Sequence, residues 1–91
     1  MNSTEALVEE RGKTHGNPDK VYGLVWDMWS SLLADDKFKE LPGWLKVEHM
    51  LILFKVGRAA HNPHVMDNYA DIRGYSLIAE QGIERMKKKS K

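Results

Sequence analysis

The chain has 91 residues, 42% of them hydrophobic, and a formal net charge of +1 at pH 7, which fits one small domain and argues against a protein that coats a polyanion. Because cysteine is absent, disulfides, thiolate zinc sites and thiol nucleophiles are excluded. No apolar run approaches the roughly 20 residues that cross a bilayer, and the N-terminus lacks a basic-then-apolar signal pattern, so we expect a cytoplasmic protein without a membrane partner.

The sequence predicts a single all-α domain over residues 1–91, with four helices and no strand. Residues 1–17 are expected to form a short N-terminal helix and a loop, because polar residues can cap a helix that Gly12 ends. Residues 18–86 are expected to form the helical core. Residues 87–91 are a basic tail, predicted to be a solvated helix end.

The second predicted helix runs from Pro18 to about Leu33, with Asn17 as its cap. At about 100° per residue its apolar side chains cover an arc of about 200°, whereas a surface helix usually shows a narrower stripe. We therefore expect part of this arc, around Trp26 and Trp29, to be a self-association surface. The arc consists of Val21, Tyr22, Leu24, Val25, Trp26, Met28, Trp29, Leu32 and Leu33.

The last two predicted helices form an antiparallel hairpin. A charged loop over residues 34–43 precedes a third helix over about 44–61, which is apolar almost all round and is therefore expected to be central. Asn62 and Pro63 break this helix and start the fourth, over about 64–88, and a connection this short predicts antiparallel packing. The expected architecture is a small four-helix domain with a central antiparallel hairpin, completed by oligomerisation.

Four charged side chains interrupt these apolar helices near the connection. Lys55 and Arg58 stand three residues apart, and Asp67 and Asp71 stand four apart, so each pair lies on one face of its helix. The helices are otherwise too hydrophobic to face solvent, and buried charge must be paired, hydrogen-bonded or bound to a ligand. We therefore expect the four side chains to be partly buried and close together.

Two interpretations of this cluster stay open. In the first, Arg58 and Asp71 form a buried ion pair, Lys55 pairs with Glu48, and both pairs fix the register of the helices. In the second, Lys55 and Arg58 bind a phosphate or carboxylate, while Asp67 and Asp71, with Glu48, hold a hydrated Mg²⁺. Mg²⁺ often takes only one or two protein carboxylates, and water and substrate phosphates complete its shell.

A few further positions bear on a site. Gly57 and Gly74 lie in helix interiors, where each costs about 1 kcal/mol relative to alanine, so they predict close helix approach or room for a ligand. His15 lies in a loop that could fold over a site. His61 and His64 lack the i, i+4 spacing of a helical zinc pair and are expected to cap or to face solvent. Without a Gly-x-Ser-x-Gly elbow or a glycine-rich phosphate loop, serine-hydrolase and P-loop chemistry are disfavoured.

Three motifs follow one another along most of the chain: Glu10-Arg11-Gly12-Lys13-Thr14-His15-Gly16, Lys55-Val56-Gly57-Arg58, and Asp67-Asn68-Tyr69-Ala70-Asp71-Ile72-Arg73-Gly74-Tyr75. In this order they resemble a family of short, uncharacterised phage-encoded helical proteins with a Lys-Thr-His-Gly loop, a Lys-x-x-Arg helix and an Asp-x-x-x-Asp-x-x-Gly-Tyr helix. The resemblance implies an all-helical fold and, for a phage protein, the cytoplasm of a host cell.

More distantly, the chain is similar to phage nucleotide-modification-associated domains and to MazG-like all-α nucleoside triphosphate pyrophosphohydrolases. Those enzymes hold Mg²⁺ with acidic clusters on two packed helices. They usually carry Glu-x-x-Glu on the first helix, whereas here Glu48 is followed at i+3 by Leu51, and only Asp67 and Asp71 echo the second cluster. The resemblance therefore implies the fold and a nucleotide link more than it implies catalysis.

The preferred hypothesis is a phage-type accessory protein that binds a nucleotide or another phosphorylated small molecule. Lys55 and Arg58 would contact phosphate, with Tyr75 among the ligand-binding residues, and Lys13 and His15 would close over the ligand. Mg²⁺ is the expected cofactor. Hydrolysis of a phosphoanhydride, in the manner of a Mg²⁺-dependent MazG-like pyrophosphohydrolase, is a subordinate hypothesis.

The rival hypothesis is a non-catalytic protein-interaction module. Such a module would inhibit a host enzyme or defence system through the face around Trp26 and Trp29, and the charged cluster would only fix the helices. A nucleic-acid partner is the weakest alternative, because affinity for DNA scales with the phosphates neutralised and the net charge is near zero. In each case we expect a homo-oligomer.

Overall fold

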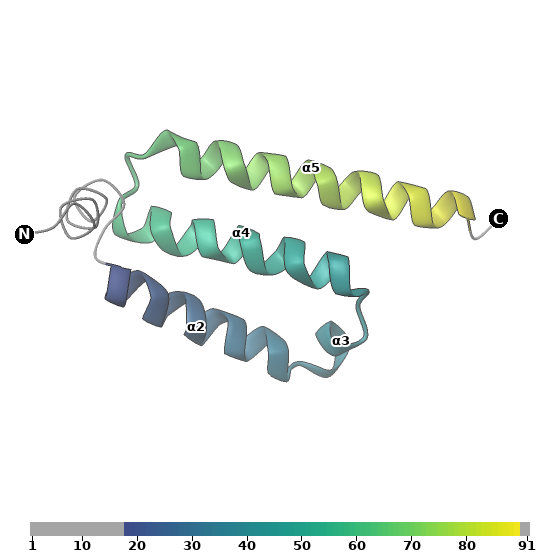
Figure 1. Cartoon of the computed structure of the whole chain (residues 1–91), viewed down its shortest axis with the longest axis horizontal. Coiled ribbons are helices and arrows are strands. Elements are labelled where there is room, and N and C mark those ends of the chain that lie inside the picture. Colours follow the sequence, from purple (N-terminus) through teal and green to yellow (C-terminus); the bar gives the residue numbers. More distant parts are fainter. Residues whose placement is uncertain (1–17, 90–91) are drawn as a thin grey trace, which may run out of the picture.

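The computed structural model of the protein describes residues 18–89, and within this range all regular structure is helical (Figure 1). The predicted all-α fold is therefore confirmed for this part of the chain. The elements are α2 (Pro18–Ala34), α3 (Asp36–Lys39), α4 (Gly43–His61) and α5 (Met66–Lys89). The N-terminal helix expected within residues 1–17 lies outside the described residues.

Helix α2 packs closely against α4 because Gly57 leaves no side chain between them. Val21 and Val25, one turn apart on α2, are buried, and a Cβ atom at Gly57 would lie 2.7 Å from Cγ2 of Val25. A hydrogen bond joins the same two helices further along, where Nε1 of Trp29 donates to the carbonyl oxygen of Met50 at 2.8 Å. The close helix approach predicted at Gly57 is confirmed.

A short helix, α3, interrupts the segment 34–43, which the sequence predicts to be a loop throughout. The Asp35 carboxylate accepts a hydrogen bond from the backbone N–H of Phe38 at 2.8 Å and caps α3. Phe38 is buried, with its ring edge-on to His49 at 5.9 Å between centroids. One side-chain cap and one buried ring thus define a single turn that is too short to show a helical period in the sequence.

The three long helices form one layer with α4 in the middle. Helices α2 and α5 both pack on α4, and Figure 1 shows them on its opposite sides. In a layer of this kind the central helix is covered at its two edges only, so few side chains become fully enclosed. The buried apolar side chains of residues 18–89 are Val21, Val25, Phe38, Leu45 and Ala59.

Helices α4 and α5 lie side by side and run in opposite directions, joined by residues 62–65 (Figure 1). Two contacts define the register: Lys55 lies opposite Asp71, and Trp44 lies opposite Gly82. Trp44 precedes Lys55 by eleven residues on α4, and Gly82 follows Asp71 by eleven residues on α5, as expected for antiparallel helices. The connection is held by the hydroxyl of Tyr69, which donates to the carbonyl oxygen of Pro63 at 3.2 Å. Within the described range, no helix has the length and apolar character needed to cross a bilayer.

Candidate functional site

Of the four charged side chains predicted to lie close together near the α4–α5 connection, only Lys55 and Asp71 form an ion pair within the described residues, and Asp67 is exposed. Nζ of Lys55 lies 2.9 Å from Oδ2 of Asp71. The Lys55 side chain is 15% exposed and that of Asp71 is 44% exposed, so the lysine is the buried member of the pair. The expected Arg58–Asp71 and Lys55–Glu48 pairs are wrong. Residues three apart on a helix differ by about 60° in direction, and this difference turns Lys55 rather than Arg58 toward α5.

Arg58 instead lies against the ring of Phe54, which faces α2. Its Cζ atom is 5.1 Å from the centroid of the Phe54 ring, and Nζ of Lys55 is 5.9 Å from the same centroid. Phe54 in turn stacks on Tyr22 of α2, with centroids 6.2 Å apart and planes 27° apart. Two cations thus flank an aromatic pair that bridges α2 and α4, an arrangement in which the ring quadrupole stabilises the charges.

The two cations differ in how far their charge is neutralised. Lys55 has the Asp71 carboxylate, whereas no ion pair joins Arg58 to a carboxylate among residues 18–89. Tyr22, at the open end of the aromatic pair, is 60% exposed. A guanidinium and an aromatic ring are therefore both available to a ligand on this side of the molecule.

Two polar atoms buried in the described part of the chain have no hydrogen-bond partner there. One is Oε2 of Glu48, two turns before Lys55 on α4, and the other is Nδ2 of Asn68 on α5. Asn68 is 2% exposed, and the register of α4 and α5 places it level with Arg58. Buried polar groups nearly always have a partner, so an orphaned donor and acceptor in one helix interface indicate where water or a ligand belongs.

Asn68 and the Tyr22–Phe54 pair were missed as site residues. Asn68 had one signal in the sequence, a polar residue within the apolar stripe of α5, and Tyr22 and Phe54 were indistinguishable from core residues. Tyr75 is half-buried on α5. Lys13 and His15 lie outside the described residues, and their predicted role stays a prediction.

The three acidic residues proposed for Mg²⁺ are not brought together as one group. Within residues 18–89 no three His, Asp or Glu side chains are placed to hold a metal ion. Asp67 is exposed, Asp71 is paired with Lys55, and the Glu48 oxygen is buried. Mg²⁺ stays a prediction, and at most Asp67 and Asp71, one turn apart on α5, can meet it together.

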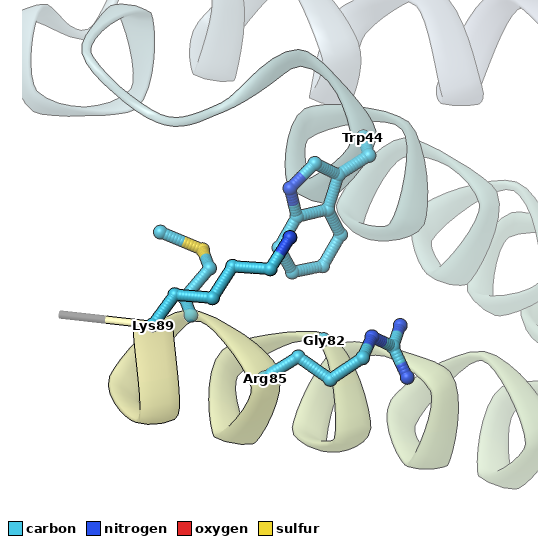
Figure 2. Close-up of a pocket in the computed structure, with 5 residues that line it drawn as sticks. Trp44, Gly82, Arg85 and Lys89 are labelled. Atoms are coloured by element: carbon cyan, nitrogen blue, oxygen red, sulfur yellow. The ribbon is translucent and has the colours of Figure 1, made fainter. Parts of the chain in front are cut away.

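The far end of the α4–α5 pair carries two open depressions that the sequence did not predict. One, of about 270 Å³, is shown in Figure 2 and is lined by Trp44, Gly82, Arg85, Met86 and Lys89. The other, of about 520 Å³, is lined by Leu45, His49, Ala79, Glu80, Ile83, Glu84 and Lys87. Both are shallow, and both lie away from the charged cluster.

A protein-family model matches residues 1–82, which include the charged cluster, and it is described as a domain of unknown function, DUF6378. The chain belongs to the DUF6378 family. No curated protein and no solved structure matches it significantly. The DUF6378 description names no activity, ligand or partner.

Proposed function

We propose that this DUF6378 protein binds a nucleotide, or another phosphorylated small molecule, at the Arg58 end of α4. The observation that supports the proposal is the position of Arg58, a half-buried guanidinium over the Phe54 ring, without an ion-pair partner among the described residues. Arginine is suited to phosphate because its planar fork donates two parallel hydrogen bonds to the oxygens.

The neighbouring groups define what such a ligand would contact. Lys55 lies near the same Phe54 ring as Arg58, but its charge is paired with Asp71, so Arg58 is the cation that would contact the phosphate. The exposed ring of Tyr22 offers a surface on which a nucleobase stacks, and such stacking is worth about 1–3 kcal/mol per base. The Asn68 amide, level with Arg58, supplies a donor for a ligand oxygen. In this proposal Tyr22 would take the base and Arg58 the phosphate, whereas Asn68 lies in the α4–α5 interface.

Mg²⁺ and hydrolysis are subordinate parts of the proposal. A dedicated three-ligand metal centre fits the described residues poorly, so Mg²⁺ would arrive with the ligand phosphates and meet Asp67 or Asp71. Hydrolysis of a phosphoanhydride in the MazG-like manner would require water activated at that ion. The resemblance to phage proteins supports a phage-type accessory role in the cytoplasm of a host cell, and the exposed apolar side chains of α2 support a homo-oligomer.

Calorimetric titration of the full chain against nucleoside mono-, di- and triphosphates, cyclic and modified nucleotides, with and without Mg²⁺, tests the proposal. We expect micromolar binding to at least one ligand, weakened tenfold or more by Arg58→Met. Arg73→Met is the matched control, because Arg73 is exposed on α5, and it should bind as the wild type does. Silence across the panel, or equal loss in both variants, would remove the proposal.

The exposed aromatic surface of α2 favours the second candidate, a protein-interaction module that disables a host enzyme or defence component. Trp26 is 62% exposed, whereas Trp29 is half-buried and bonded to Met50. Trp26 is therefore the residue to change. If Trp26→Glu abolishes the effect of the protein in cells while Lys55→Ala with Arg58→Met preserves it, the interaction candidate replaces ligand binding.

A further inference from the structure

One face of α5 carries a column of side chains that is symmetric about its centre. The residues are spaced 4, 3, 4, 4, 3 and 4 apart, which at 100° per residue keeps them within an arc of about 80°. The column consists of Asp67, Asp71, Gly74, Ile78, Gly82, Arg85 and Lys89. Residues at these spacings lie along one side of a helix and can all meet a second helix that packs lengthwise against it.

The symmetry pairs opposite charges across Ile78. Asp71 and Arg85 each lie seven residues from it, and Asp67 and Lys89 each lie eleven residues from it. A second copy of α5 that ran antiparallel to the first and met it at Ile78 would therefore bring both acids of each chain opposite both cations of the other. A two-fold interface uses the same patch on both subunits, and this patch complements itself only in the antiparallel direction.

The two glycines of the column are symmetric as well, each four residues from Ile78, but the structure fills only one of them. At Gly82 the Trp44 ring of α4 occupies the space that a side chain would take, with Cζ3 at 2.6 Å from the position of a Cβ atom. At Gly74 nothing lies within 4 Å of that position. In the antiparallel pairing the Trp44 ring of one chain faces the open space at Gly74 of the other. The ring can therefore pack into that space.

Within residues 18–89 the column is only partly covered, because α4 contacts it at Asp71 through Lys55 and at Gly82 through Trp44. Ile78, at its centre, is 47% exposed, and Asp67, Arg85 and Lys89 are exposed. Figure 2 shows Lys89 extending toward the Trp44 ring, while Arg85 runs along α5 below it, and both residues line the depression with Gly82. The column therefore borders the groove between α4 and α5 at its Gly82 end.

We propose that the protein forms a two-fold symmetric dimer through this column, with α5 of each chain lying antiparallel to α5 of the other. Each α5 then fills the α4–α5 groove of the other chain, and the four helices make a bundle whose centre is Ile78. In such a dimer the second copy covers the groove between α4 and α5 and adds to the small core of the single layer. The dimer proposal does not depend on the ligand site proposed above.

Disulfide cross-linking tests the symmetry axis, because the chain has no native cysteine. In the full-length protein, Ile78→Cys places two thiols at the axis, within the 4.4–6.8 Å between Cα atoms that a disulfide spans. Leu77→Cys is the control, since Leu77 is also exposed but points about 100° away. We expect rapid, nearly complete dimer cross-linking of the first variant under mild oxidation, and little of the second. Equal rates for the two would overturn the proposal.

A charge exchange tests the pairing of opposite ends. At each end of the dimer, Asp67→Lys alone places a new lysine beside Arg85 and Lys89 of the other chain, and Lys89→Asp alone places a new aspartate beside Asp67 and Asp71 of the other chain. Each single variant should therefore weaken dimerisation tenfold or more in sedimentation equilibrium. The double variant exchanges the signs and should restore most of the wild-type affinity. A double variant as weak as the worse single one contradicts the antiparallel register.

Gly74→Leu tests the recess without endangering the fold. The space at Gly74 is open within the chain, and leucine favours a helix by about 1 kcal/mol over glycine. The variant should fold at least as stably as the wild type and yet be monomeric, because the new side chain excludes the Trp44 ring of the second copy. Gly23→Leu, at an open and exposed glycine of α2, should remain dimeric. A wild-type protein that is monomeric at about 100 μM, or a Gly74→Leu dimer as tight as the wild type, would refute the interface.

Discussion

The ammonium of Lys55 lies 2.9 Å from the carboxylate of Asp71, and this ion pair joins the middle helix of the layer to α5. The two partners are unequally buried, with 15% of the lysine side chain exposed and 44% of the aspartate. Removing one partner leaves the other charge uncompensated, and the cost depends on how easily water reaches that charge. The two partners should therefore differ in how much their replacement lowers the free energy of unfolding.

We expect Asp71→Asn to destabilise the protein more than Lys55→Met does. The first change leaves a largely buried ammonium without its counter-charge and should lower the free energy of unfolding by about 2–3 kcal/mol. The second leaves a half-exposed carboxylate that water can solvate, while methionine retains the apolar stem, and should cost about 1 kcal/mol. Urea denaturation of both single variants and the double variant measures this. An equal cost for the two single changes would show that the partners are equally solvated.

Replacing two glycines by alanine should have opposite effects on stability. At Gly57 the new methyl group meets Cγ2 of Val25 at 2.7 Å across the α2–α4 interface, and overpacking of this kind costs about 1–3 kcal/mol. At Gly23 nothing lies within 4 Å, so alanine should add about 0.5–1 kcal/mol through its helix propensity. Thermal unfolding followed by circular dichroism separates the two, and a stabilised Gly57→Ala protein would show that α2 shifts away from α4 at little cost.

The sequence predicted the layout of the helices better than the partners of their side chains. The helical spacing of apolar residues around Val25 and the break at Pro63 were enough to predict the long helices, because both signals are contained within a short stretch of sequence. The choice of Lys55 rather than Arg58 for Asp71 depends on how α4 is rotated between its two neighbours. That rotation is set by Gly57 and other contacts between distant segments, which a single-helix period does not contain.

The short helix α3 could not be predicted from its own residues either. Its single turn depends on the Asp35 cap and on the burial of Phe38 beside His49, both of which require the ends of α2 and α4 to be in place. Asp35→Ala should cost about 1 kcal/mol of unfolding free energy through loss of the cap, and Phe38→Ala about 3–5 kcal/mol through loss of a buried ring. Asp36→Ala is the control, because its partner Lys39 is 3.7 Å away on the exposed side and the pair should contribute little. Urea denaturation distinguishes the three, and a neutral Asp35→Ala would mean that α3 is held by Phe38 alone.

Replacement of Asn68 by leucine should change the stability of the protein and its ligand affinity in opposite directions. Its side chain is 2% exposed and its Nδ2 atom has no hydrogen-bond partner among residues 18–89, so the free protein retains the cost of an unsatisfied buried donor, about 1–3 kcal/mol. Asn68→Leu, of similar size and without the donor, should therefore unfold at the same or a higher temperature than the wild type. If the donor serves a bound phosphorylated ligand, the same variant should bind that ligand several-fold more weakly in calorimetry. Asn68→Asp is the contrasting change, because it buries a carboxylate in place of the amide and should lower both stability and affinity. A clearly destabilised Asn68→Leu protein would show that the amide is already satisfied, by water or by residues 1–17, and would remove Asn68 from the ligand site.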